Sequence, residues 1–83
     1  MKKIIIKFKG DLFDINITKI LAYPDNVYLI EYPNKSVLSS IIQPPIYIIE
    51  KENILSFQDE ANLKYIDLLH SISQGIEENS HLF

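Results

Sequence analysis

The chain has 83 residues, a length that suits one small domain. It contains no cysteine and no arginine, which excludes disulfides, thiolate metal sites and the two-bond grip of a guanidinium on phosphate. The hydrophobic share of 47% and the net charge of −3 exclude a disordered composition, so the chain is expected to fold around a core of its own or on a partner subunit.

The N-terminal segment has the lysines of a secretion signal without its apolar stretch. Lys7 interrupts the apolar run after Ile4–Ile6, so a cleavable signal peptide is not expected. No apolar run elsewhere reaches the roughly 18–20 residues that span a bilayer. The sequence therefore predicts a cytoplasmic protein with no membrane partner.

The first two predicted strands form a hairpin. Apolar and polar residues alternate with period two on either side of residues 10–11, where Gly-Asp suits a two-residue turn. This turn places Phe8 opposite Phe13 on the buried side and Lys7 opposite Asp14 on the other side. The N-terminal lysines then line the solvated side of a strand.

A third strand is predicted at 27–32, between two Tyr-Pro pairs that we interpret as turns rather than as a ligand-binding loop. If Tyr23 pairs with Val27, Leu21 lies opposite Leu29. Lys19 then lies opposite Glu31, on the side that carries the core residues. Either the sheet edge is reached there or a bulge switches the faces, and the pattern leaves both open.

Three further strands are predicted after the third. Segments 35–42 and 46–51 have strand composition, and the two prolines of Gln43-Pro44-Pro45 mark a corner between them. Residues 54–57 form a short last strand after a turn. The apolar period then becomes helical.

The C-terminal segment predicts one amphipathic helix over 58–77, with Ser56 or Asp59 as its N-cap. Gly75 is a candidate end point, and fraying through Glu77-Glu78 is the alternative. The apolar arc of this helix consists of Ala61, Tyr65, Leu68, Leu69, Ile72 and Ile76.

Together these elements predict an α+β fold. It is an antiparallel β-meander of about five strands, with a small roll or half-barrel as one form, covered by the C-terminal helix. We expect a single domain over 1–78, β-rich over 1–57 and helical over 58–77, followed by a flexible tail at 79–83.

Residues that carry catalysis or bind metals are sparse. His70 falls on the polar side of the helix and His81 in the tail, a spacing unlike that of a metal-binding helical pair. Asp67, His70 and Ser71 are neighbours on the helix, but exposed side chains on one small helix provide no oxyanion pocket. We therefore predict no catalytic, metal-binding or cofactor-binding residues, no cofactor and no enzyme activity.

The N-terminal lysines are the one feature that suggests nucleic-acid binding. They form a stripe near Phe8, but the alternation buries that ring away from them. The negative net charge and the absence of arginine also argue against an electrostatic footprint. The stripe consists of Lys2, Lys3, Lys7 and Lys9.

The surplus of apolar and tyrosine residues points instead to an interaction surface. We predict a small non-enzymatic protein-interaction module, of the accessory, inhibitor or immunity type, that binds another protein or itself as a homodimer. The alternative is a binder of a small ligand such as a nucleotide, with a pocket between sheet and helix or between subunits. The predicted interaction residues are Tyr28, Ile30, Tyr32, Tyr47 and Ile49.

Overall fold

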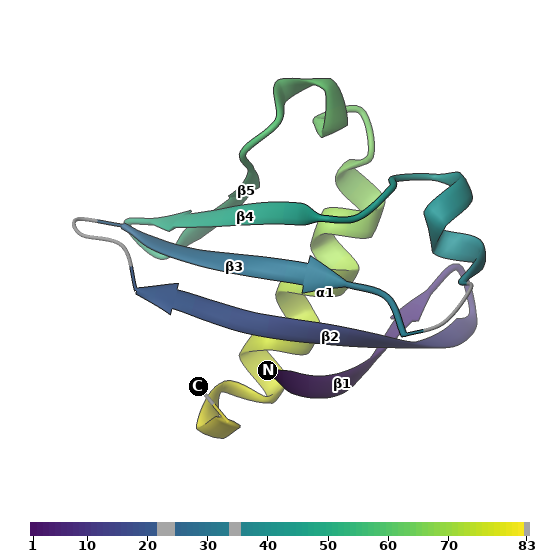
Figure 1. The fold of residues 1–83 in the computed structure, drawn as a ribbon, viewed down its shortest axis with the longest axis horizontal. Coiled ribbons are helices and arrows are strands. Elements are labelled where there is room, and N and C mark those ends of the chain that lie inside the picture. The colour runs from purple at the N-terminus through teal and green to yellow at the C-terminus, as the bar shows by residue number, and fades with distance from the viewer. Residues whose placement is uncertain (22–24, 34–35, 83) are drawn as a thin grey trace.

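The computed structural model describes residues 1–21, 25–33 and 36–82, with the side chain of Leu21 excepted. Five antiparallel strands form one meander, and one helix packs against it (Figure 1). The strands are β1 (Lys2–Phe8), β2 (Asp11–Leu21), β3 (Asn26–Glu31), β4 (Ile46–Lys51) and β5 (Ile54–Phe57), in that spatial order. The helix α1 spans Ile66–Glu78, and short 3-10 helices are found at η1 (Val37–Ser40), η2 (Glu60–Asn62) and η3 (Ser80–Leu82).

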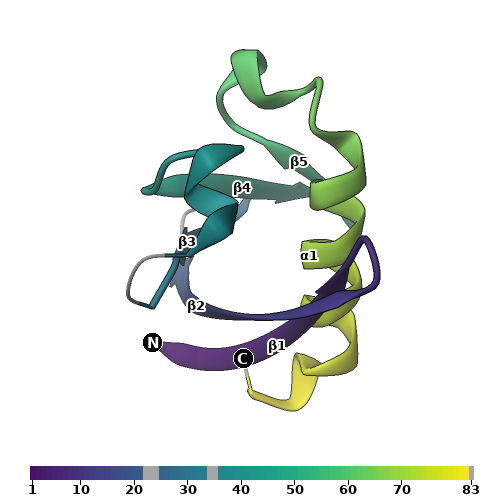
Figure 2. The same ribbon diagram turned by 90° about the vertical axis from the view of Figure 1, so that its right-hand side faces the viewer.

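The sheet curls into a half-barrel, and α1 lies across its open side against β1 and β5 (Figure 2). The predicted fold class is therefore confirmed. The core fills the space between the inner face of the sheet and α1. Its buried side chains are Ile4, Ile6, Phe8, Ile15, Ile17, Tyr28, Ile30, Ile46, Ile48 and Phe57 from the strands, Leu68, Leu69, Ile72 and Ile76 from α1, and Leu38 and Ile42 from the β3–β4 connection.

The β1–β2 turn is one residue earlier than predicted. Phe8 pairs with Asp11, so the two turn residues are Lys9 and Gly10. Their φ values of +50° and +83° are the left-handed pair that a type I′ hairpin turn requires. Every pair is consequently displaced by two residues along β2, and an even displacement keeps each side chain on its predicted face.

The displaced register changes the predicted contacts of this hairpin. Phe8 no longer pairs with Phe13, although their ring centroids still lie 6.5 Å apart. The predicted pair of Lys7 with Asp14 is wrong, since Lys7 lies opposite Leu12 on β2. The carboxylate of Asp14 lies instead 3.9 Å from the ammonium of Lys3 on the outer face.

The β2–β3 pairing also differs from the one considered from the sequence. Lys19 pairs with Tyr28 and Leu21 with Asn26, so the predicted pairings of Lys19 with Glu31 and of Leu21 with Leu29 are wrong. Tyr23 lies outside the described residues. The β2–β3 pairing is continuous over residues 16–21, so neither a bulge nor a sheet edge interrupts it. Lys19 therefore stays on the inner face of a central strand, in line with the core residues.

The segment predicted as a strand at 35–42 contains η1 instead. Ser36 Oγ accepts a hydrogen bond from the backbone N–H of Leu38 (3.2 Å), and the Ser39 hydroxyl donates to the carbonyl of Ser36 (2.6 Å). Serine hydroxyls that bond to nearby backbone groups compete with strand pairing. Leu38 in this helical turn is buried, and so is Ile42 just after it.

The C-terminal helix begins at Ile66, not at residue 58. Asp59 caps only η2, where its carboxylate accepts a hydrogen bond from the N–H of Ala61 (2.9 Å). Ala61 is exposed and contributes nothing to the core. The local cap at Asp59 thus starts a single 3-10 turn, and the apolar face of the true helix starts at Leu68.

Of the two ends predicted for this helix, the structure has the later one, because α1 continues through Gly75 to Glu78. A Cβ atom on Gly75 would lie 2.7 Å from Ile6 Cγ2, so the missing side chain allows α1 to approach β1 closely. In the segment predicted as a flexible tail, η3 places Leu82 against the core. Phe83 lies outside the described residues.

Candidate functional site

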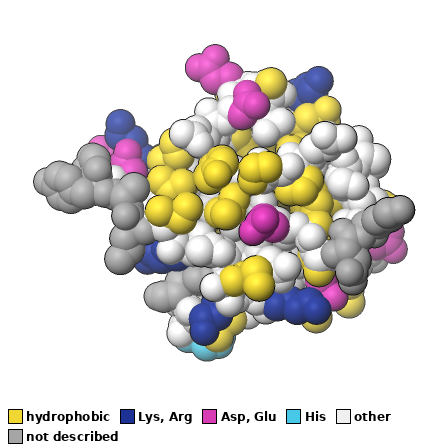
Figure 3. Space-filling view, viewed as in Figure 1, with side chains coloured by type: hydrophobic (Ala, Val, Ile, Leu, Met, Phe, Trp, Pro, Cys, Tyr) yellow, Lys and Arg dark blue, Asp and Glu magenta, His cyan; other side chains and the backbone are white. Residues whose placement is uncertain are grey.

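The face of the sheet that points away from α1 carries six uncharged side chains in two adjacent rows. Ile20 and Tyr47 are each 39% exposed, and the other four are half-buried. Figure 3 shows hydrophobic side chains gathered at the centre of this face. We call these residues the outer-face array; one row is Ile20, Val27 and Ile49, and the other is Thr18, Leu29 and Tyr47.

Two of the five predicted interaction residues, Tyr47 and Ile49, belong to the outer-face array. Tyr28 and Ile30 are only 4% and 0% exposed and face α1, so their assignment to the surface is wrong. Tyr32 is half-buried against the core on the inner side. The structure therefore does not bring the five together on one surface.

The other apolar members of the outer-face array, Ile20, Val27 and Leu29, are absent from the predicted set. Both faces of β3 carry apolar residues, so alternation alone does not separate the inner face from the outer face. Glu31 supplies a partial signal, because it is exposed and lies in phase with Val27 and Leu29. On β3 the charged residue lies on the solvent side, whereas Lys19 on β2 and Glu50 on β4 lie in phase with core residues, so a charge alone does not identify the outer face.

Opposite charges flank the outer-face array along the strand direction. Glu31 follows the array on β3 and Lys51 follows it on β4; because the strands are antiparallel, these exposed charges lie at opposite ends. Asp25, in the bend before β3, is also at the Lys51 end and is half-buried. The array is therefore an apolar strip with the carboxylate of Glu31 at one end, and with the ammonium of Lys51 and the carboxylate of Asp25 at the other.

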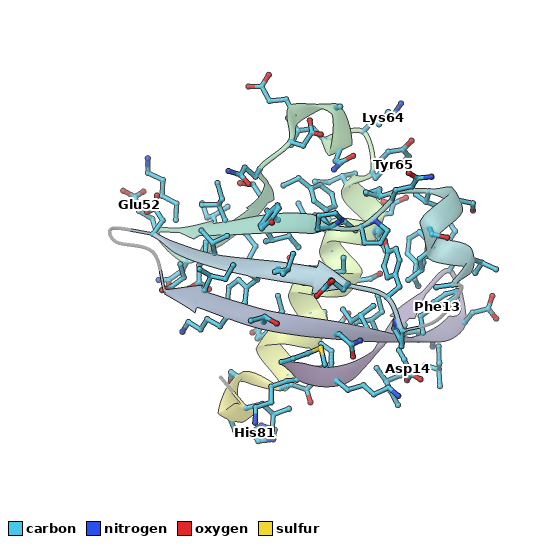
Figure 4. The ribbon with its side chains drawn as sticks, viewed as in Figure 1. Phe13, Asp14, Glu52, Lys64, Tyr65 and His81 are labelled. Atoms are coloured by element: carbon cyan, nitrogen blue, oxygen red, sulfur yellow. The ribbon has the colours of Figure 1, made fainter. Side chains whose placement is uncertain are left out.

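A cleft of about 420 Å³ adjoins the outer-face array at Tyr47. Its polar lining includes the amides of Gln58 and Asn62. Lys64 lies along its other wall, with the ammonium 5.2 Å from the ring centroid of Tyr65 (Figure 4). Tyr47 thus joins the apolar strip to a polar cleft.

One end of the half-barrel, between sheet and helix, opens into a hollow of about 460 Å³. Burial, and secondarily the Glu50 carboxylate, raise the pKa of Tyr28 at this end. The charged, tyrosine and aliphatic side chains that line the hollow are Lys19, Tyr28, Glu50 and Leu55 from the sheet and Ile76 and Glu77 from α1. Apolar walls and opposite charges therefore face the same space.

The other end of the half-barrel is covered by η1 and is apolar. Leu38 is 1% exposed there, and Phe8 and Phe13 form a tilted ring pair nearby. The hydroxyl of Tyr32 is buried without a hydrogen-bond partner. Burial also raises the pKa of Tyr32 to about 12.

The described residues contain no group of three or more histidine, cysteine or acidic side chains positioned to hold a metal ion. His70 is exposed on α1, and the hydroxyl of Ser71 donates to the backbone carbonyl of Asp67 (3.2 Å). His81 lies at the opposite end of the molecule from Lys64 and Tyr65 (Figure 4). The described histidines therefore do not converge with the polar cleft.

Comparison of the chain with protein-family models, curated proteins and solved structures gave no match. Within the described residues, no helix is both long enough and apolar enough to cross a membrane. Inferences about function accordingly rest on the geometry of the outer-face array and of the hollow.

Proposed function

We propose that this protein is a non-enzymatic interaction module that works through the outer-face array. The observation that carries this proposal is the pair of adjacent rows across β2, β3 and β4, in which five of six side chains are apolar and none is charged. Apolar side chains gathered on one face are typical of association surfaces, whereas scattered ones need no explanation. A cytoplasmic location stays a prediction from the sequence.

The occupant that fits this surface is a second copy of the chain. A two-fold axis that runs between the two rows, perpendicular to the strands, lays the row with Val27 against the partner's row with Leu29. The same axis exchanges the two ends of the array and brings Glu31 of one copy towards the end of the other copy that carries Lys51 and Asp25. Apolar contact in the middle and opposite charges at the rim match the usual anatomy of an interface.

Pairing of sheet edges is less suited to this role. The β1 edge carries lysines at three of its seven positions, and like charges on facing edge strands repel each other. The β5 edge is only four residues long, and α1 packs against both edge strands. The face of the sheet is therefore the better candidate for association.

Light scattering across a dilution series tests the proposal. The wild-type chain of 9.7 kDa is expected to show twice that mass at high micromolar concentration, and Leu29→Lys or Tyr47→Lys is expected to give monomers. Leu12→Lys is the matched control, because Leu12 is 70% exposed on the outer side of β2 but outside the array. A wild-type monomer at high concentration would overturn the proposal.

A charge exchange tests the orientation of the two copies. Glu31→Lys and Lys51→Glu are each expected to weaken association about tenfold, because each variant places like charges at the rim. The double variant is expected to recover most of the wild-type affinity. Additive weakening in the double variant would show that the array associates in another orientation.

A second candidate function, small-ligand binding, is favoured by the hollow at the open end of the half-barrel. Its volume of about 460 Å³ lies within the range of roughly 300–1,000 Å³ found for ligand pockets. Its polar groups come from both the sheet and α1, as expected of a site at the junction of two layers. Native mass spectrometry of gently purified protein tests for a retained small molecule, and a chain that carries none would count against this candidate.

Nucleic-acid binding through the N-terminal lysines remains the least favoured alternative. Lys3 is already paired with Asp14, and Lys9 lies over the ring of Phe8 with its ammonium 5.4 Å from the centroid. Phe8 itself is buried and unavailable for stacking on a base. Neither observation supports a nucleic-acid surface.

A further inference from the structure

The position of Lys19 is unusual for a lysine on a central strand. Ile15, Ile17 and Lys19 follow one another on the inner face of β2, and the first two are fully buried. Lys19 pairs with the buried Tyr28 and is itself half-buried. A charged side chain at such a position requires a compensating partner or access to water.

Carboxylates share the hollow with Lys19 but do not contact it. Glu50 accepts a hydrogen bond from the side-chain amide of Asn26 (3.0 Å), and Glu77 lies on α1 at the far wall. Among the described residues, an ammonium and a carboxylate come within 4.0 Å of each other only at Lys3 and Asp14. The hollow therefore presents a positive group and negative groups across a gap.

Two aliphatic side chains line the hollow together with these charged groups. Leu55 on β5 and Ile76 on α1 line the hollow, and Ile76 is only 4% exposed. A ligand that spans the hollow thus meets an ammonium, at least one carboxylate and an aliphatic wall. Two carboxylates against one ammonium disfavour a phosphate, whose charge is purely negative.

We propose that this hollow binds a small zwitterion, namely a free α-amino acid with an aliphatic side chain. Its carboxylate accepts hydrogen bonds from Lys19, its ammonium donates to Glu77, and its side chain lies on Leu55 and Ile76. Both ligand charges are then neutralised by charge-assisted hydrogen bonds from opposite walls. This inference rests on the second candidate function and is independent of the outer-face array.

Titration of the full chain with L-leucine, followed by amide chemical shifts, tests the ligand class. We expect saturable shifts at Lys19, Tyr28 and Ser73, which line the hollow. Two probes each lack one charge of leucine: 4-methylpentanoate has no ammonium and isopentylamine has no carboxylate. Each is expected to bind about tenfold or more weakly, because one charge-assisted contact is lost.

Glutamates at adjacent positions on α1 provide a matched pair of variants. Glu77→Gln is expected to weaken leucine binding about tenfold, because Glu77 lines the hollow. Glu78→Gln is expected to leave binding unchanged, since Glu78 instead accepts a hydrogen bond from Gln74 (3.1 Å) outside the hollow. Lys19→Met should weaken binding of leucine and of 4-methylpentanoate, while isopentylamine binding is retained.

The outcomes separate this inference from its premise. If leucine produces no saturable shifts, the proposal of a zwitterionic ligand is overturned. Equal binding of leucine, 4-methylpentanoate and isopentylamine would overturn it as well. Equal effects of Glu77→Gln and Glu78→Gln would overturn the assigned contact. If leucine fails but native mass spectrometry finds another retained small molecule, the zwitterion proposal is overturned while small-ligand binding, the second candidate function, stands.

Discussion

At one end of the half-barrel, η1 covers the inner face of the sheet and leaves Leu38 only 1% exposed. At the other end, Lys19 and Glu50 face a hollow of about 460 Å³ beside the C-terminal half of α1. The same central strands, β2, β3 and β4, run through both ends. The difference therefore depends on the last residues of each strand and on the connection that covers one end only.

This contrast suggests a division of labour within a small core. The covered end buries aliphatic and aromatic side chains and supplies stability, whereas charged side chains, among them Lys19 and Glu50, line the hollow at the open end. Marginal stability means that a chain of this size tolerates few unpaired polar groups unless they are useful or solvated. Substitutions of aliphatic side chains at the two ends should therefore differ in the size of their effect on stability.

The largest difference is expected from shortening an aliphatic side chain at each end. Leu38→Ala at the covered end should lower the free energy of unfolding by about 2–5 kcal/mol, because Leu38 is fully enclosed. Leu55→Ala at the open end should cost less, because Leu55 is half-buried beside the hollow. Urea unfolding measures the change in the free energy of unfolding for both variants, provided that its dependence on urea concentration stays the same. Equal losses of stability in the two variants would contradict a difference between the two ends.

A methyl group added between the two ends probes the contact of α1 with β1. In Gly75→Ala, the new Cβ would lie 2.7 Å from Ile6 Cγ2, and overpacking of this kind typically costs about 1–3 kcal/mol. The higher helix propensity of alanine offsets up to about 1 kcal/mol of that cost. A net loss of stability is therefore expected in thermal unfolding. A net gain would mean that α1 is not held tightly against β1.

Tyr32→Phe tests the one polar flaw of the covered end. The Tyr32 hydroxyl is buried without a hydrogen-bond partner, so its removal should be neutral or stabilising by up to about 1 kcal/mol. A loss of more than that in urea unfolding at neutral pH would show that the hydroxyl has a partner.

The pH dependence of the same variant gives a second measurement. Burial raises the pKa of Tyr32 from 10.0 in the unfolded chain to about 12 in the folded protein, so the folded state holds this proton more tightly. The stability that the protonated Tyr32 contributes is fully present below pH 10 and is lost as the pH rises through 12. The wild type should therefore lose more stability than Tyr32→Phe over this interval, and parallel profiles would contradict the assignment.

The smallest effect is expected on the outer face of the sheet. Lys3→Ala removes the ion pair with Asp14, whose side chains are 61% and 49% exposed at a separation of 3.9 Å. Exposed pairs of this kind contribute about 0–1 kcal/mol and weaken with added salt. A larger change in the free energy of unfolding, or one insensitive to salt, would indicate a structural role for Lys3.

Strand alternation was sufficient to assign the faces of the first hairpin but not its register. Ile4, Ile6 and Phe8 are buried as predicted, because alternation reports the face directly. The turn was misplaced because a glycine fits either position of a two-residue turn, and only the backbone shows that Lys9 also has positive φ. Local composition thus gave the faces, and the register required the three-dimensional turn.

The candidate sites were harder to predict, because they depend on how distant strands align. The outer-face array exists only because Ile20, Val27 and Ile49 share one row across three strands. The hollow likewise requires Lys19 and Glu77, which are far apart in sequence, to line one space. Serine-rich η1 was misassigned for a different reason, since its hydroxyl-to-backbone bonds override the strand preference of its apolar residues.

The order in which the elements are made has a consequence for synthesis on the ribosome. All five strands precede α1 in the chain, yet α1 lies against both edge strands and across the concave side of the sheet. A nascent chain that has completed β5 therefore exposes two open edges and the inner apolar face until residues 66–78 emerge from the exit tunnel. During that interval the unfinished sheet is a substrate for chaperones and for strand exchange between neighbouring chains, and the arrival of the last helix ends both hazards together.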